Sequence, residues 1–457
     1  MTVHALAGLA LLNLVLFASG AALLWAVRGY DSWIDAGRLA GLSYLTGVAG
    51  VGSTWTLLLV ASVPFSLAIV LGVPVAVTVV AALVGRRLGR RLPVLGSIGG
   101  GPGVLAGALA IAAAGLLLEA AFRSARLAGL YSWDAWAFWV PKAKAIYFFG
   151  GLDEQFFTTL PGSSYPPLVP VLDAAAFHVM GSPDVVTLHV QYWFLGVGFV
   201  WALAGLLSER VPVWMLWPFV LLALVAPRIG RRLHVPEADL LLDYFFVISA
   251  VLVCFWLLDR EPWQLAGASI LLCGLVLTKR EGLLLGAALL LSAVLASGGQ
   301  LRVTWRPLAF MAAVPVAVAV PWRIWYVAQG VGGEGPAGGG LNPTENVERL
   351  WPSLRLAIET LVDTGYWSAI PLLTVGALAV GALARARVPV VFFAALIVFV
   401  TLSGGWITWA IPELEITDEF DANPIVRFMG AAALASVAAT PLLLAAAWSA
   451  ATERGSQ

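Results

Sequence analysis

The chain has 457 residues, of which 60% are hydrophobic and only 11% are charged, whereas a soluble protein carries about 25% charged residues. This composition excludes an ordinary soluble protein and predicts a polytopic membrane protein. The formal net charge is zero, so no bulk electrostatic argument favours a nucleic-acid partner. The two cysteines, Cys254 and Cys273, lie in apolar runs, are not spaced as a metal site and are interpreted as small core residues.

Apolar stretches of span length recur along the whole chain and predict an all-α fold with about thirteen transmembrane helices. They fall near 4–27, 40–61, 65–84, 103–122, 184–207, 212–228, 240–258, 264–278, 282–297, 307–328, 367–384, 388–408 and 425–449. The first run has no preceding basic residue and no small-x-small cleavage pattern, so we interpret it as a retained span. The stretch from Pro166 to Met180 is short and carries Asp173 and His178, which predicts a half-membrane or re-entrant helix.

The distribution of Lys and Arg predicts the orientation. With the N-terminus outside, half of the 26 basic residues fall in short cytoplasmic loops and the rest spread over much longer outer loops. We therefore expect a cell-membrane protein with its N-terminus outside and its C-terminus in the cytoplasm. The substantial outer segments are then 123–183, 329–366 and 409–424.

The first outer segment contains YSWDAWAFWVPKAKAIYFF, an aromatic run that includes Lys142 and Lys144. This composition is typical of a helix lying in the membrane interface, with its lysines reaching toward the headgroups. Asp134 stands at the start of the run. It could cap the helix or act as a general base that takes a proton from an acceptor hydroxyl, and spacing leaves both interpretations open.

The sequence TKREG at 278–282 interrupts an apolar run from about 264 to 297. That run is too long for one crossing and predicts two short helices, with Lys279, Arg280 and Glu281 at the turn between them. Two adjacent cations there either face a polar cavity or an anion, or form an ion pair with Glu281 at the loop tip.

A third polar segment, PRIGRRLHVPEADLLLDYFF, places Arg228, Arg231 and Arg232 on the outer side, against the usual bias. A lipid headgroup or a substrate phosphate would account for them, because guanidinium groups bind phosphate in a bidentate manner. His234, Glu237 and Asp239 follow, and their spacing is not diagnostic of a metal site.

Arg427 lies at the predicted outer start of the last span. It could neutralise a bound phosphate, reach to the interface, or pair with Asp418, Glu419 or Asp421 just before it.

These features in this order resemble the GT-C superfamily of membrane glycosyltransferases, most of all the bacterial branch near the protein O-mannosyltransferases and the lipid A aminoarabinose transferases. The matching residues are Trp133-Asp134, Tyr165-Pro166-Pro167-Leu168 and Leu277-Thr278-Lys279-Arg280-Glu281-Gly282. The resemblance covers roughly residues 103–450. Residues 1–102 would then be an N-terminal three-span addition to a GT-C-like core at 103–457.

The resemblance implies a polyprenyl-phosphate-linked sugar donor, inversion at the sugar carbon, and a glycan, lipid or protein acceptor on the extracytoplasmic side. Asp134 would be the catalytic carboxylate, and Lys279, Arg280 and Arg427 would hold the lipid phosphate, with Arg228 and Arg231 as further candidates. Trp133, Tyr165, Glu237 and Asp239 are expected to contact the substrates. Many relatives carry two adjacent acidic residues here, whereas Ala135 follows Asp134, which leaves the use of Mg²⁺ or Mn²⁺ open.

Two other classes of function compete with this interpretation. A transporter or lipid flippase would use charges near the bilayer midplane and would often show repeated halves. A non-catalytic envelope scaffold would need no constellation of carboxylates and cations. Convergence of Asp134 with the outer cations on one cavity would favour the enzyme.

Overall fold

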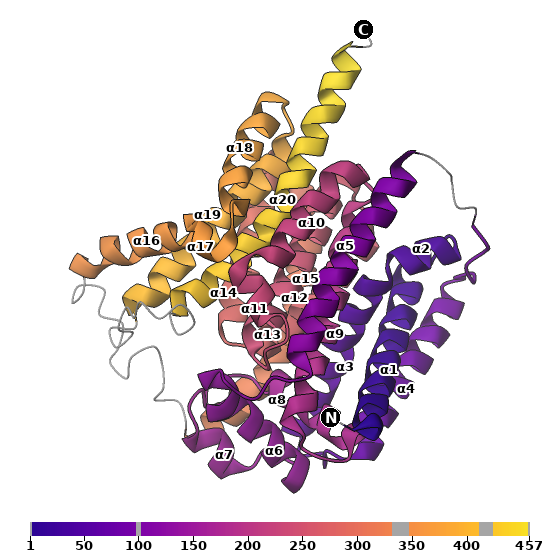
Figure 1. Ribbon diagram of the computed structural model, residues 1–457, viewed down its shortest axis with the longest axis vertical. Coiled ribbons are helices and arrows are strands. Elements are labelled where there is room, and N and C mark those ends of the chain that lie inside the picture. Colours follow the sequence, from indigo (N-terminus) through magenta and orange to yellow (C-terminus); the bar gives the residue numbers. More distant parts are fainter. Residues whose placement is uncertain (1, 97–101, 331–346, 411–423, 456–457) are drawn as a thin grey trace.

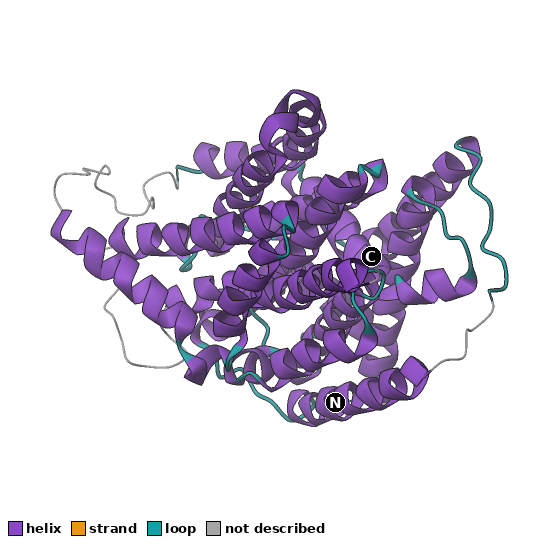
Figure 2. Ribbon diagram, turned by 90° about the horizontal axis from the view of Figure 1, so that it is seen from above, coloured by secondary structure: helices purple, strands orange, loops and turns teal. Residues whose placement is uncertain are grey.

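The computed structural model describes residues 2–96, 102–330, 347–410 and 424–455, and in these ranges Figure 2 shows helices and loops but no strand. The all-α prediction is confirmed. The helices are α1 (Val3–Val27), α2 (Trp33–Arg38), α3 (Ala40–Val60), α4 (Leu67–Arg87), α5 (Pro102–Ala125), η1 (Ala135–Trp139), α6 (Val140–Phe149), α7 (Glu154–Thr159), α8 (Leu168–Met180), α9 (Val185–Leu207), α10 (Val213–Val225), α11 (Pro227–Arg232), α12 (Ala238–Asp259), α13 (Pro262–Thr278), α14 (Glu281–Ser297), η2 (Gly298–Gln300), α15 (Leu301–Ala328), α16 (Val347–Val362), α17 (Thr364–Trp367), α18 (Ile370–Leu383), α19 (Arg387–Ala410) and α20 (Pro424–Gly455).

Nine helical stretches in the described residues are long and apolar enough to cross a membrane, or ten if one bent pair counts as a span. The chain is therefore a multi-pass membrane protein, and the prediction of thirteen spans is wrong. Two predicted spans, α10 and α13, have only 13 and 17 residues, which is about 20 and 26 Å of helix.

The other two surplus spans arise because hydropathy does not show where helices join. The predicted spans 282–297 and 307–328 belong to one helical stretch of 48 residues, Glu281–Ala328. The predicted span 367–384 is α18, which meets the helical segment Val347–Trp367 at a bend of 111°. The two short helices predicted around TKREG are observed as α13 and α14.

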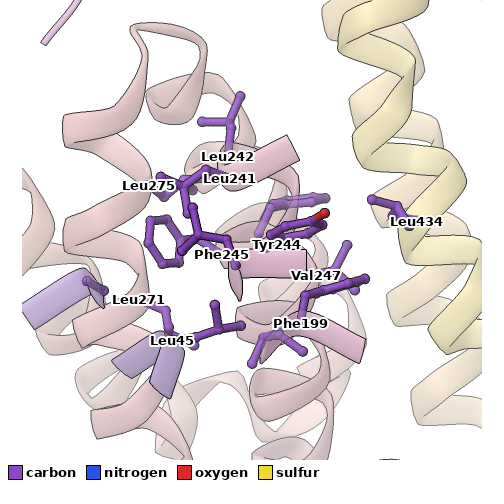
Figure 3. Close-up of a cluster of buried hydrophobic side chains, with 14 of the residues drawn as sticks. Leu45, Phe199, Leu241, Leu242, Tyr244, Phe245, Val247, Leu271, Leu275 and Leu434 are labelled. Carbon is purple, nitrogen blue, oxygen red and sulfur yellow. The ribbon is translucent and has the colours of Figure 1, made fainter. Parts of the chain in front are cut away.

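The centre of the bundle is α12, of which nearly all the apolar window is buried. Figure 3 shows its side chains packed against Leu45 of α3, Phe199 of α9, Leu271 of α13 and Leu434 of α20. The ring of Tyr244 stacks on Phe199 with a centroid separation of 4.3 Å. Because α12 contacts helices from the whole length of the chain, the position of its first turn is fixed by the entire core.

The first three spans, α1, α3 and α4, pack directly into this bundle. Gly20 and Gly47 let α1 and α3 approach so closely that a Cβ on Gly20 would lie 1.7 Å from the carbonyl oxygen of Ser43. The side-chain amide of Asn13 in α1 donates to Gln191 of α9 at 2.8 Å. The division of the chain at residue 103 stays a prediction, and in space the two parts share one core.

The two ends of the bundle are distinct. Asp239 and Asp259 mark the first and last turns of α12, which puts them about 30 Å apart, close to the thickness of the hydrocarbon core. Figure 1 shows α6, α7 and α8 gathered at one end of the bundle and the C-terminus at the other. We call the end that holds Asp239 the cavity end and the end that holds Asp259 the far end.

Candidate functional site

A cavity of about 340 Å³ lies at the cavity end, a volume within the range of small-molecule sites. Helix ends and loops from distant parts of the chain form its wall. The lining residues are Trp133, Asp134, Phe138, Pro161, Gly162, Ser164, Tyr165, Asp239, Leu242, Lys279, Arg280, Glu281, Ile407, Pro424, Arg427 and Phe428.

Arg427, in the first turn of α20, joins two carboxylates in this cavity. Its Nε donates to Oδ2 of Asp239 at 2.5 Å and its Nη2 donates to Oδ1 of Asp239 at 3.2 Å. The same Nη2 also donates to Oδ2 of Asp134. The guanidinium thus holds Asp134, from the first predicted outer segment, against the first turn of α12.

Lys279, at the α13–α14 turn, binds the opposite side of Asp239. Its Nζ donates to Oδ1 of Asp239 at 3.0 Å and lies 3.8 Å from Oε1 of Glu281. Burial alone would lower the pKa of Lys279, but the attraction of Asp239 and then of Glu281 raises this pKa above its ordinary value. Lys279 is therefore a cation at every physiological pH.

The aromatic ring of Tyr165 lies against both Lys279 and Arg280. The ring stacks on Trp139 with a centroid separation of 5.4 Å, and both Lys279 Nζ and the Arg280 guanidinium lie 5.3 Å from its centroid. Nη1 of Arg280 donates to Oγ of Ser164 at 3.4 Å. The loop that carries the YPPL motif therefore positions the charges of the α13–α14 turn.

The helical segment after Asp134 differs from the prediction in two respects. Asp134 has helical backbone angles and its side chain makes no capping hydrogen bond, so the capping interpretation is wrong. Lys142 does not reach toward headgroups: it is buried, and its Nζ donates to the carbonyl oxygens of Pro161 at 3.2 Å and Gly162 at 2.8 Å. Trp133 and Trp136 are about half exposed at this end, as expected for rings at the interface.

Some predicted site residues do not line the cavity. Glu237 forms a buried ion pair with Arg232, and Arg231 lines a separate cavity of about 410 Å³ together with His234. Arg228 is buried outside the cavity lining, and its burial and then the neighbouring Arg232 lower its pKa to about 10, so it stays protonated at neutral pH. Of the predicted phosphate ligands, the structure brings only Lys279, Arg280 and Arg427 into the cavity.

Several lining residues were missed from the sequence, namely Phe138, Pro161, Gly162, Ser164, Leu242, Ile407, Pro424 and Phe428. Ser164 directly precedes the YPPL motif, and this adjacency is the one signal that could have identified it. The acidic residues proposed as competitors for Arg427, Asp418, Glu419 and Asp421, lie outside the described residues.

The charged groups do not form a protein-built metal site. Within the described residues no group of three or more His, Cys, Asp or Glu side chains converges. The two nearest carboxylates, Asp134 and Asp239, share the Arg427 guanidinium, which occupies the position from which a divalent cation would bridge them. The positive charge in this cavity comes from Lys279, Arg280 and Arg427.

Comparison of the chain with protein-family models, with curated proteins and with solved structures finds no match.

Proposed function

We propose that the protein is an integral membrane glycosyltransferase of the GT-C type, which transfers a sugar from a polyprenyl-phosphate donor to an acceptor hydroxyl. The cavity end would then face the extracytoplasmic side, with the N-terminus outside and the C-terminus in the cytoplasm. The acceptor is a glycan, a lipid or a protein.

The observation that carries this proposal is the convergence of three carboxylates (Asp134, Asp239 and Glu281) and three cations on one cavity, where Asp239 and Glu281 pair with Lys279 and Asp134 contacts Arg427. Asp134, Lys279, Arg280 and Arg427 come from three segments that are far apart in the chain. Transferring ionised groups out of water costs free energy. Their burial together in one helix bundle is therefore best explained by a ligand on which they act. A carboxylate beside a set of cations is what transfer from a phosphate-linked sugar requires.

The proposed reaction is a single displacement. A carboxylate oxygen of Asp134 takes the proton of the acceptor hydroxyl while the hydroxyl oxygen forms a bond to the anomeric carbon. The bond between that carbon and the phosphate oxygen breaks, and the polyprenyl phosphate leaves with the electron pair. Lys279, Arg280 and Arg427 stabilise the negative charge that develops on the leaving phosphate. Attack opposite the leaving group inverts the configuration.

Arg427 would couple donor binding to the activation of Asp134. In the structure this guanidinium is shared between Asp134 and Asp239. A donor phosphate would compete with both carboxylates for it, because guanidinium binds phosphate in a bidentate manner. When Arg427 turns to the phosphate, the Asp134 carboxylate is released from its ion pair and can contact the acceptor hydroxyl.

A transporter or lipid flippase is the alternative. Such a protein would use charged groups near the bilayer midplane. Asp239, Lys279 and Arg427 instead lie at helix ends and line a cavity about 30 Å from the far end of α12. This placement favours chemistry at the membrane surface over passage across the membrane.

The test is sugar transfer by purified protein in vesicles, with radiolabelled polyprenyl-phosphate sugars added to either side. We expect transfer with outward-facing donor, and loss of at least about a hundredfold in Asp134→Asn. Glu154→Gln is the matched control, because Glu154 lies on the same segment, is exposed and does not line the cavity. Undiminished transfer in Asp134→Asn would overturn the catalytic assignment, and movement of intact donor without transfer would favour the flippase.

A further inference from the structure

A second cavity, of about 500 Å³, lies at the far end of the bundle, away from the candidate site. Its walls come from the last turn of α12, the first half of α13 and the first half of α15. The lining residues are Trp256, Arg260, Pro262, Leu265, Ala266, Ser269, Val303, Thr304, Pro307, Phe310 and Met311.

This cavity is a groove that faces the lipid. Val303 and Phe310 in its wall are 77% and 74% exposed, which in a membrane-spanning helix means contact with acyl chains. From Pro262 to Ser269 the wall extends along α13 by about 10 Å, roughly a third of the hydrocarbon thickness. The groove therefore has the depth of part of one lipid leaflet.

A cation closes the groove at the membrane surface. The guanidinium of Arg260 lies 4.7 Å from the ring centroid of Trp256, and its Nη2 donates to the side-chain oxygen of Gln300. Its Nη1 is buried and has no hydrogen-bond acceptor among the described residues. A buried donor without an acceptor is costly, so this atom points to a ligand that supplies one.

The neighbourhood of Arg260 carries further positive charge. Arg302 and Arg306 lie in the first turns of α15, beside the lining residues Val303 and Pro307. Pro307 has no N–H to donate to the carbonyl oxygen of Val303, so the helix leaves an acceptor at the groove wall. A phosphate group and hydroxyls of one headgroup would satisfy these donors and this acceptor together.

We propose that this groove binds one anionic phospholipid of the leaflet opposite the candidate site, with its phosphate on Arg260 and an acyl chain along α13 and α15. Basic pockets between membrane helices bind anionic headgroups through this combination of apolar wall and terminal cation. The proposal is independent of the sugar-transfer reaction, because none of these residues lines the catalytic cavity.

The test compares lipid binding by native mass spectrometry and by the rise in Tm on adding phosphatidylglycerol or phosphatidylcholine to purified protein. We expect tighter retention of phosphatidylglycerol by the parent, and about tenfold weaker retention in Arg260→Gln. The matched control is Arg123→Gln, which removes an exposed arginine at the other end of the bundle and should bind like the parent.

Ala266→Trp provides a second test, because it fills the groove without changing any charge and should also weaken retention about tenfold. It keeps the proposal testable if Arg260→Gln does not fold. Equal retention of the two lipids by the parent would overturn the proposal. So would unchanged phosphatidylglycerol retention in Ala266→Trp.

Discussion

Two groups of four charged residues occupy opposite ends of the bundle and have the same net charge. The cavity cluster consists of Asp134, Asp239, Lys279 and Arg427, and the far-end cluster consists of Arg28, Asp35, Arg38 and Glu209. Each contains two acids and two bases, and in each the acids and bases form ion pairs. Composition therefore cannot distinguish a site from a structural contact in this protein.

Burial distinguishes the two clusters. Side chains of the cavity cluster are 8–13% exposed. Those of the far-end cluster range from 11% for Asp35 and 14% for Arg28 to 23% for Arg38 and 32% for Glu209, so its Arg38–Glu209 pair is the more exposed one. Water screens an exposed pair and its formation is nearly neutral in free energy. A buried pair must overcome the desolvation of both ions, which Coulomb attraction offsets only in part. Burying the cavity cluster therefore costs more free energy than forming the far-end cluster, and we attribute this cost to a function.

The largest expected effect tests this difference with one arginine from each end. Arg427→Gln leaves Asp134 and Asp239 buried without their shared cation, so we expect a loss of about 3–5 kcal/mol in unfolding free energy and at least about a hundredfold in transfer rate. Arg210→Gln breaks the pair with Asp259 at the far end, in which the side chains are 33% and 31% exposed, and should change stability by less than about 1 kcal/mol. Thermal unfolding in detergent and the vesicle transfer assay provide both readouts.

Arg427→Lys keeps the positive charge. It provides a second measurement if Arg427→Gln does not fold. It should recover most of the stability but only part of the rate, because an ammonium group cannot bridge two carboxylates or a phosphate in the bidentate manner of guanidinium. A fully active Arg427→Lys would show that charge alone matters at this position.

The next effect concerns Lys279, which touches only one of the two carboxylates. Lys279→Met leaves Asp239 paired with Arg427, so we expect the protein to fold and the KM for the donor to rise about ten- to a hundredfold, the range for loss of one charged hydrogen bond. Lys144→Met is the control, because Lys144 does not line the cavity. Equal donor KM in the two variants would remove Lys279 from the phosphate site.

The pH profile sharpens the assignment of Lys279. The pKa of Lys279 is raised above its ordinary value, so the group stays protonated as the pH rises through its ordinary range near 10. Transfer by the parent should therefore show no loss of donor affinity between pH 7 and 9.5. A donor KM that climbs across that interval would mean that Lys279 titrates there and is less firmly paired than the structure indicates.

The sequence predicted the cavity cluster in part because some of its charges interrupt apolar runs. Lys279 and Arg280 interrupt a long apolar run, and Asp134 is a single carboxylate in an aromatic segment. Their partners could not be predicted in the same way. Lys279 and Asp239 are 40 residues apart and Arg427 and Asp134 are 293 apart, and only the packing of the core decides which helix ends meet.

The errors of prediction have the same origin. Hydropathy found every apolar helix, but it could not show that α10 and α13 are too short to cross or that α18 bends away from α16. It also placed Lys142 at the headgroups, whereas the loop carbonyls of Pro161 and Gly162 hold it in the interior. Local composition thus fixes which segments are apolar, and long-range contacts determine how each charged side chain is used.

A smaller effect tests whether helix packing sets the geometry of the cavity cluster. Gly430 lies one turn after Arg427, and a Cβ there would come within 2.5 Å of Oδ2 of Asp243 in α12. Gly430→Ala should therefore displace the buried carboxyl group of Asp243, cost about 1–3 kcal/mol in stability and reduce transfer by up to about tenfold if this shift reaches Arg427 one turn earlier. Gly286→Ala is the matched control, because a Cβ there meets nothing within 4 Å and should stabilise the protein by up to about 1 kcal/mol.

Gly430→Ala with parent-like activity would mean that the cavity cluster tolerates the repacking of Asp243 against α20. The assay thus distinguishes a preorganised site from one that donor binding assembles.

The smallest effect is expected in the far-end cluster. Nη2 of Arg38 lies 2.5 Å from Oε1 of Glu209, yet a double-mutant cycle of Arg38→Gln and Glu209→Gln should give a coupling energy of only about 0.2–1 kcal/mol. Raising the salt concentration from 0.1 to 1 M should reduce this coupling, because the screening length falls from about 10 to 3 Å. A salt-independent coupling above about 2 kcal/mol would contradict the comparison, since the far-end cluster would then behave like a buried network. Sugar transfer should stay within about twofold of the parent in all three variants, because the far-end cluster lies a bilayer thickness from the cavity.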